Sequence, residues 1–203
     1  MKALATNALT LVFLVLTLLC VGGQMIAGYA LEKSEVSDHD GPVPTFMEYV
    51  SSSSFGVDLL ENWQSEFMQF SMFIALTVWL VQRGSAESKS PGDAGRPAAA
   101  GSGWLRRHSL LVVMTTCFLA TWAGQSLTGW RAFNEEQSLH GQAAIAWGSY
   151  LGESEFWART LQNWQSEFLA VAAMAIFTVY LREAGSPESK RVETADADNE
   201  PTY

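Results

Sequence analysis

Asn62-Trp63-Gln64-Ser65-Glu66-Phe67 recurs unchanged as Asn163-Trp164-Gln165-Ser166-Glu167-Phe168. The two copies are 101 residues apart, the difference between positions 163 and 62. At this offset the halves of the chain align without a gap from Leu9/Leu110 to Lys89/Lys190. The pattern Gly-Ser-x-Glu-Ser-Lys also occurs twice, at 84–89 and 185–190, and other identical pairs include Gly23/Gly124, Gln24/Gln125 and Gly28/Gly129. The sequence therefore predicts an internal duplication.

The apolar residues gather into blocks instead of being spread as in a globular core. No charged residue occurs between Lys2 and Glu32, nor from Ser109 to Trp130. Both blocks reach the roughly 20 residues that cross a bilayer core of about 30 Å. Two shorter blocks, Phe67 to Gln82 and Phe168 to Leu181, occupy equivalent positions in the repeat, so we interpret them as spans too. We expect an all-α integral membrane protein with four transmembrane helices, at about 7–31, 62–83, 108–130 and 163–182.

A cleaved signal peptide is the competing interpretation of the first block, because Lys2 is followed by an apolar stretch and then by Gly28-Tyr29-Ala30. The same kind of block returns at Ser109 to Trp130, in the middle of the chain, where no signal peptide can lie. The duplication therefore favours a retained helix.

Each repeat holds two spans, so both repeats enter the membrane in the same direction, as a parallel repeat. The expected units are residues 1–89 and 107–190, with a flexible linker at 90–106 rich in Pro, Gly and Ala and an acidic, disordered tail at 191–203. Positive charge marks the cytoplasmic side. The termini and the linker hold most of the 12 basic residues, so we expect both termini in the cytoplasm and the loops 32–61 and 131–162 outside.

The two long outer loops place aromatic and apolar residues at helical spacing, in Thr45 to Val50, in Phe55 to Leu60 and around Trp147. Short helices lying on the membrane surface fit this pattern. The alternative is ordinary cover over the outer ends of the bundle.

The repeated Asn-Trp-Gln-Ser-Glu-Phe and Gly-Ser-x-Glu-Ser-Lys motifs, with Gly-Gln-x-x-x-Gly at the end of the first and third spans, resemble an uncharacterised bacterial family of small membrane proteins with a domain of unknown function. The resemblance covers nearly the whole chain apart from the linker and the tail. It implies a location in the bacterial inner membrane. It implies no activity, substrate or catalytic residue.

Glu66 and Glu167 are the first candidate site residues, because a carboxylate near the edge of an apolar span is costly unless it is offset. One interpretation is structural: Asn62 and Asn163 cap the helices, Trp63 and Trp164 anchor them at the interface, and each Glu favours the helix dipole. In the other, Gln24 and Gln125 lie at the same depth and form a polar cluster with the two Glu residues. Gly23, Gly28 and their counterparts would then let the helices approach closely.

A metal site is a weaker alternative. Glu35 and His39, and in the second copy Glu136 and His140, have the spacing that places both side chains on one helical face. A solvated loop explains the same residues. Cys20 and Cys117 occupy different positions in the two halves and are interpreted as packing thiols. We therefore expect no cofactor and no catalytic residue.

The net charge of -9 argues against a nucleic-acid partner, because phosphate binding needs clustered basic residues. The bilayer is the expected partner, and a transporter would be a homo-oligomer, because four helices leave little room for a solute path within one chain. The leading function class is a non-enzymatic membrane protein with a structural or interaction role. The alternative is a small transporter or channel that uses the Glu and Gln cluster, and an outer-face metalloenzyme comes third.

Overall fold

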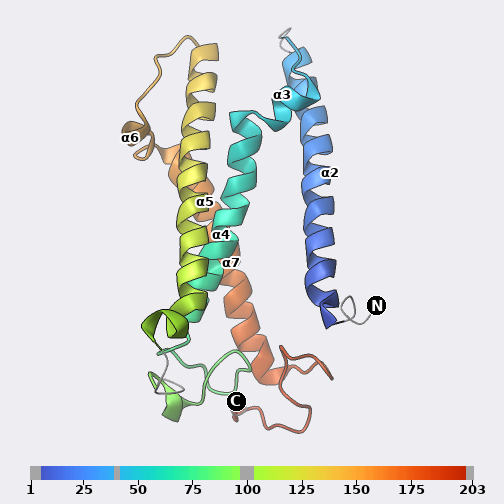
Figure 1. The fold of residues 1–203 in the computed structure, drawn as a ribbon, viewed down its shortest axis with the longest axis vertical. Coiled ribbons are helices and arrows are strands. Elements are labelled where there is room, and N and C mark those ends of the chain that lie inside the picture. The colour runs from blue at the N-terminus through green and yellow to red at the C-terminus, as the bar shows by residue number, and fades with distance from the viewer. Residues whose placement is uncertain (1–5, 39–41, 97–102, 200–203) are drawn as a thin grey trace. The chain divides into compact units, whose positions relative to one another are not determined.

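The computed structural model describes residues 6–38, 42–96 and 103–199, and within these ranges the chain is helical and contains no strand. Figure 1 shows the elements in chain order. They are α2 (Ala8–Asp38), α3 (Phe46–Val50), α4 (Ser53–Leu76), a 3-10 turn (Pro91–Asp93), α5 (Trp104–Leu139), α6 (Trp147–Tyr150) and α7 (Ser154–Tyr180).

The chain divides into two compact units, which we describe separately. Unit 1 comprises Met1–Asp58 and Thr128–Ala144, and unit 2 comprises Leu59–Leu127 and Ile145–Tyr203. Helices α4 and α5 each contribute to both units. The units therefore do not coincide with the two sequence repeats.

The long helices differ from their expected bounds. Helix α2 continues past residue 31 to Asp38, because the stretch 32–38 contains no Gly or Pro. Helix α4 begins at Ser53, where the Ser52 hydroxyl accepts a hydrogen bond from the Phe55 amide (3.2 Å), and it ends at Leu76, not at 83. The chain then turns, and the Val78 carbonyl accepts a bond from the Gly95 amide (2.7 Å).

Short helices do occur in both loops between the long ones. Thr45 and Glu48 form a capping box at the start of α3: the Thr45 amide donates to the Glu48 carboxylate (2.6 Å), and the Glu48 amide donates to the Thr45 hydroxyl (3.3 Å). Helix α6 occupies the equivalent place in the second half. The stretch from Phe55 to Leu60 is not a separate surface helix, because it forms the first turns of α4.

Unit 1 is held together by aromatic packing of α3 against α2. The ring of Tyr29 meets that of Phe46 edge to face at 5.6 Å, and buried Tyr49 packs on Phe55 at 5.5 Å. Any side chain at Gly28 would run into the Tyr49 hydroxyl. The glycine therefore makes room for an aromatic ring at this point of the helix.

In unit 2 an aromatic cluster joins α5 to α7. The ring of Trp122 lies 5.9 Å from that of Trp164 and 6.2 Å from that of Phe156, and Phe156 contacts buried Tyr150. A side chain at Gly124 would press on Leu60 of α4, with 3.0 Å between the added Cβ and a leucine methyl group. The small residue thus lets α4 and α5 approach closely, whereas the sequence led us to expect close approach of the helices that carry Gln125 and Glu167.

Two helices, Ala8–Ser37 and Trp104–Leu139, are long and apolar enough to cross a membrane by length and composition. In the first helix no residue of the most apolar stretch is buried. In the second helix only a small share of that stretch is buried. Core helices of soluble proteins and signal sequences satisfy the same criterion, so these helices are a weak indication of membrane association.

The chain segments that follow α4 and α7 adopt matching turns. Gly84 and Gly185 both have positive φ, at 82° and 87°. In each copy a backbone amide donates to the hydroxyl of a serine six residues later. The Gln82 amide donates to Ser88 (2.7 Å), and the Glu183 amide donates to Ser189 (2.8 Å). The repeated Gly-Ser-x-Glu-Ser-Lys motif therefore specifies the same local backbone twice.

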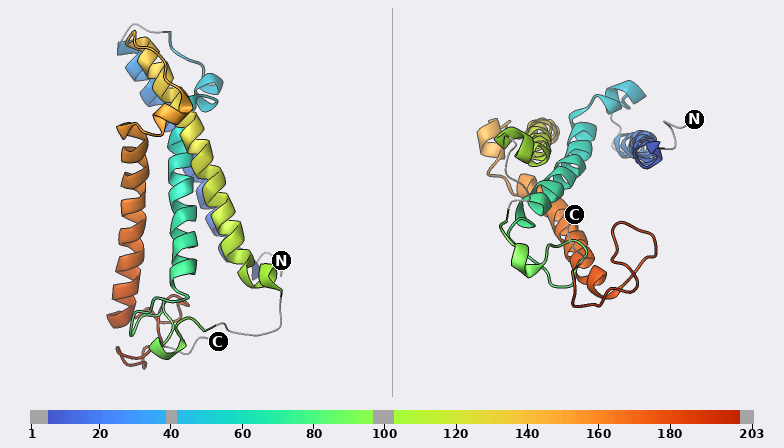
Figure 2. Two further views of the ribbon diagram at one scale, coloured as in Figure 1. Left: turned by 90° about the vertical axis from the view of Figure 1, so that its left-hand side faces the viewer. Right: turned by 60° about the horizontal axis from the view of Figure 1, so that its bottom comes forward.

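Residues 191–199 fold back onto these turns, although the sequence led us to expect a disordered tail; residues 200–203 lie outside the described chain. The segments after α4 and α7 lie at the same end of unit 2 (Figure 2). The Asn199 side chain donates to the carbonyls of Gln82, Ser85 and Ser88 at 2.9–3.1 Å, and its oxygen accepts from the Gly84 amide (3.0 Å). A single side-chain amide thus bonds four polar backbone groups of the first turn.

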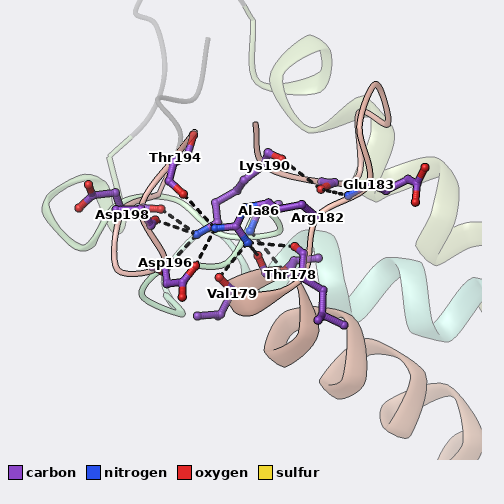
Figure 3. A network of polar contacts seen from close by, with 12 residues as sticks. Ala86, Thr178, Val179, Arg182, Glu183, Lys190, Thr194, Asp196 and Asp198 are labelled. Atoms are coloured by element: carbon purple, nitrogen blue, oxygen red, sulfur yellow. Dashed lines mark hydrogen bonds and ion pairs between the residues drawn. The ribbon is translucent and has the colours of Figure 1, made fainter. Parts of the chain in front are cut away.

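Two basic side chains complete this network, as Figure 3 shows. Arg182 pairs with Asp196 (2.9 Å) and also donates to carbonyls at the end of α7. Lys190 is 2% exposed, and its ammonium group donates to the carbonyls of Ala195, Asp196 and Asp198 at 3.1–3.2 Å. These bonds offset the cost of burying the charge and hold the tail in place.

Candidate functional site

The two copies of the repeated motif meet in unit 2, where α4 packs beside α7. The Trp164 indole donates to the side-chain oxygen of Gln64 (2.9 Å), and the Ser65 hydroxyl donates to the Glu167 carboxylate (3.3 Å). Slightly further along, the Gln69 side chain donates to the Glu167 carbonyl (3.3 Å). Side chains of one motif copy therefore bind those of the other.

The groups at this layer are buried and bonded. Gln64 is 0% exposed and Ser65 1% exposed. The Gln64 amide also donates to the Glu61 carbonyl (3.1 Å), and Ser65 also donates to the Asn62 carbonyl (2.9 Å). Such directional bonds fix the register of α4 against α7, because a shift of either helix would leave buried polar atoms without partners.

An ion pair joins the same two helices one turn nearer their beginnings. Arg159 lies 3.0 Å from Glu61 and 3.6 Å from Glu155 on its own helix. Glu61 is the more buried partner of the Arg159–Glu61 pair. The Arg159 guanidinium thus links α7 to α4 and pairs with two carboxylates near the starts of these helices.

The sequence led us to expect a polar cluster of Gln24, Glu66, Gln125 and Glu167, and only the second pair lies within one unit of the structure. Gln24 lies in unit 1 and Glu66 in unit 2, so their pairing stays a prediction. In the second copy the Gln125 amide donates to the Thr160 hydroxyl (3.5 Å), whereas Glu167 accepts from Ser65. The carboxylate and the amide of that copy thus each have a partner other than one another.

Asn62 and Asn163 are not helix caps, which corrects the structural interpretation of the motif. Helix α4 begins at Ser53 and α7 at Ser154, so both asparagines lie inside their helices. The Asn163 side chain donates to the Arg159 carbonyl (3.0 Å) one turn earlier. Trp63 is 41% exposed, whereas its counterpart Trp164 faces α4, so the two copies use the tryptophan differently.

The alternative metal site gains no support from the geometry. His39 lies outside the described residues. The His140 ring nitrogen lies 2.9 Å from the Glu136 carbonyl, a contact with the backbone at the end of α5. Within the described ranges no group of three or more His, Cys, Asp or Glu side chains is arranged to hold a metal ion.

A second candidate feature was missed by the sequence analysis: the pair Glu87 and Glu188. These residues occupy equivalent places in the Gly-Ser-x-Glu-Ser-Lys motif, which we had used only as a sign of duplication. Burial raises the pKa of Glu87, and the charge of Glu188 and a hydrogen bond with its side chain raise that pKa further. The position of these two residues in the motif was the signal that could have identified them.

Glu87 is held in place by contacts of its turn with α7. The hydroxyls of Ser85 and Thr178 lie 3.0 Å apart, and the Ala86 amide donates to Thr178 (3.3 Å). The Ser85 hydroxyl accepts from the Glu87 amide (3.1 Å). Ser85 is fully buried, so this anchor is shielded from solvent.

Comparison with known proteins adds a family but no activity. The model of the family described as "Domain of unknown function (DUF6766)" matches residues 1–201. The chain belongs to this family. No curated protein and no solved structure matches the chain. Membership in the DUF6766 family confirms only that the chain carries a domain of unknown function, and it assigns no catalytic or binding residue.

Proposed function

We propose that this DUF6766 protein is a multi-pass protein of a bacterial inner membrane with a structural or interaction role. The membrane location rests on one observation, the exposed apolar surface of α2. Leu9, Phe13, Leu18 and Ile26 are all exposed, and at 100° per residue they point to different sides of the helix. An apolar surface all around a helix is stable in hydrocarbon and unfavourable in water.

Two further spans are proposed in α4 and α7. Their 24 and 27 residues correspond to about 36 and 40 Å at 1.5 Å per residue, which exceeds the roughly 30 Å of a bilayer core. Both helices carry charges in their first half. The Arg159–Glu61 pair and the bond from Ser65 to Glu167 lower the cost of placing those charges near a membrane boundary.

The tandem duplication is part of the same proposal. Its support is the identical motif at two sites and the matching turns at Gly84 and Gly185. Two copies of a two-helix unit place both termini and the linker on one side, and the basic residues there favour the cytoplasm.

Labelling of single cysteines tests the topology. In a variant with Cys20 and Cys117 replaced by Ser, one cysteine is introduced at Ala94, Gln142 or Val192, all exposed positions. Four spans with cytoplasmic termini predict that a membrane-impermeant maleimide labels only position 142 in intact spheroplasts, and all three positions after lysis.

The two-span alternatives give other patterns. If only α2 and α5 cross and the N-terminus is inside, position 94 is labelled and 142 is protected. If the N-terminus is outside, positions 142 and 192 are both labelled. Either result would overturn the four-span proposal, and labelling of all three positions in spheroplasts would do the same.

The interaction role rests on α3 and α6. Phe46 and Trp147 are repeat-equivalent, and both remain exposed although they are large and apolar. Such residues on short helices suit contact with a partner protein or a second copy. Cross-linking in native membranes should give a product whose yield falls in the double variant Phe46→Ser, Trp147→Ser at unchanged topology. The absence of any product, or an unchanged yield, would contradict this role.

A further inference from the structure

A groove runs between the second half of α4 and α7 within unit 2. Two adjoining cavities of about 290 and 220 Å³ share Gln69, Phe73, Glu87 and Val171 in their walls. The four shared residues form a wall common to both cavities, and we use the word groove for the larger one. Its volume lies close to about 300 Å³, where the range of small-molecule sites begins.

The walls of the groove are apolar over most of their length. The side chains that form this apolar part come from both helices and the turn after α4, and they include Met72, Phe73, Leu76, Leu80, Phe168 and Ala175. Glu87 lines both cavities, and Glu188 lines the smaller one. The groove thus combines an apolar wall with the carboxyl group of Glu87, and Glu188 lies in the wall of the adjoining cavity.

No basic side chain of the described chain forms an ion pair with either carboxyl group. The nearby basic residues have other partners: Arg182 binds Asp196, the Lys190 ammonium binds three backbone carbonyls, and Arg83 donates to the Ala197 carbonyl (3.3 Å). Glu87 and Glu188 are hydrogen-bonded to each other, and the negative charge that they share has no basic partner among the described side chains.

We propose that this groove binds a small organic cation with an apolar body, its positive group at Glu87 and its body against Phe73 and Phe168. Charge complementarity selects the cation, since an anionic or neutral occupant would leave the carboxyl pair without a counter-charge. The mostly apolar wall favours an organic cation over a metal ion, because the apolar body of such a cation is removed from water there. Both aromatic rings also favour a positive ligand through their π faces.

Benzyltrimethylammonium is a suitable probe, because it joins one fixed positive charge to one aromatic ring. Its binding to the purified full chain in a neutral detergent is measured by isothermal titration calorimetry. We expect saturable binding with one site per chain. In the double variant Glu87→Gln, Glu188→Gln the affinity should fall at least tenfold.

A matched control is the double variant Glu183→Gln, Glu193→Gln, which removes two negative charges from exposed positions of the same region outside the groove walls. It should bind the probe as the natural chain does. A second test of the site is Ala175→Phe, which fills the groove and leaves both carboxyl groups in place; it should also weaken binding. This variant separates occupation of the groove from attraction to surface charge.

Three outcomes would overturn the proposal: no saturable binding to the natural chain, equal loss in both double variants, or binding unaffected by Ala175→Phe in a folded protein. Equal loss would mean attraction by net charge alone. Unaffected binding by Ala175→Phe would show that the probe binds elsewhere and that lipid or detergent chains fill the groove. The inference depends only on unit 2, so it is tested separately from the membrane topology.

Discussion

The indole nitrogen of Trp164 donates to the side-chain oxygen of Gln64 across 2.9 Å, so the second residue of one motif copy binds the third residue of the other. The reciprocal residue, Trp63, is 41% exposed. The same six residues therefore perform different tasks in the two halves. The same substitution can therefore be made at Trp164 as the test and at Trp63 as the control.

We expect Trp164→Phe to destabilise the protein by about 1–3 kcal/mol, because the fully buried Gln64 oxygen loses its indole donor. The free energy of unfolding is measured by denaturant titration in detergent. Trp63→Phe is the control and should change the free energy by less than about 0.5 kcal/mol. Equal effects of the two substitutions would show that the Trp164 bond is not stabilising.

The turn glycines allow a similar comparison. Gly84→Ala and Gly185→Ala should each cost about 1 kcal/mol, because both positions have positive φ. The loss of stability should be larger for Gly84→Ala, because an added Cβ would also collide with the Asp196 carbonyl. At Gly185 an added Cβ would have no atom within 4 Å. Limited proteolysis of the tail should accelerate only in Gly84→Ala. Equal acceleration in both variants would contradict the packing of the tail on the first turn.

Lys190 and Lys89 occupy equivalent places in the two motifs, yet only Lys190 is enclosed by tail carbonyls. Lys190→Met keeps the length of the side chain and removes its three donors. We expect faster hydrogen exchange in residues 191–199 and a loss of stability of about 1.5–3 kcal/mol, the range of bonds to charged groups. Lys89→Met should leave the exchange unchanged. Protection of the tail in both variants would exclude a role of the ammonium in holding it.

The sequence predicted the helical class, the long α2 and α5 and the short helices in the loops, because apolar periodicity and turn residues are local signals. It misplaced the starts of α4 and α7, since charged and polar residues such as Asp58 and Arg159 obscured helical turns that tertiary packing stabilises. Duplication also implied equal roles for equivalent residues. The contacts of Trp164 and Lys190 differ from those of Trp63 and Lys89, because each copy packs against different neighbours.

Of the candidate site, the sequence identified the motif residues but not their contacts. The repeat marks Gln64 and Ser65 only as members of the motif. Their burial depends on how α4 lies beside α7, which no local sequence pattern indicates. The tail was expected to be disordered on composition alone. Its order comes from Asn199, Arg182 and Lys190, whose backbone partners are distant in the sequence or determined by turn geometry.

The carboxyl pair gives a pH dependence whose sign can be worked out. Burial and the neighbouring Glu188 raise the pKa of Glu87 in the folded protein above its ordinary value of 4.5. Between these two values the folded state binds more protons than the unfolded state, so the free energy of unfolding falls as the pH rises through this window. Above the folded pKa the ionised pair repels, and part of the stability is lost.

Glu87→Gln removes the titration while keeping the size of the side chain. We expect it to raise stability at neutral pH and to flatten the fall in stability between about pH 4.5 and the higher folded pKa. Glu193→Gln, at an exposed position of the tail, is the control and should leave the slope unchanged. Unfolding midpoints measured at a series of pH values decide the matter. Two results would contradict a raised pKa of Glu87 in the folded protein. One is a natural chain whose stability rises with pH over this window, and the other is a pH slope of stability in Glu87→Gln equal to that of the natural chain.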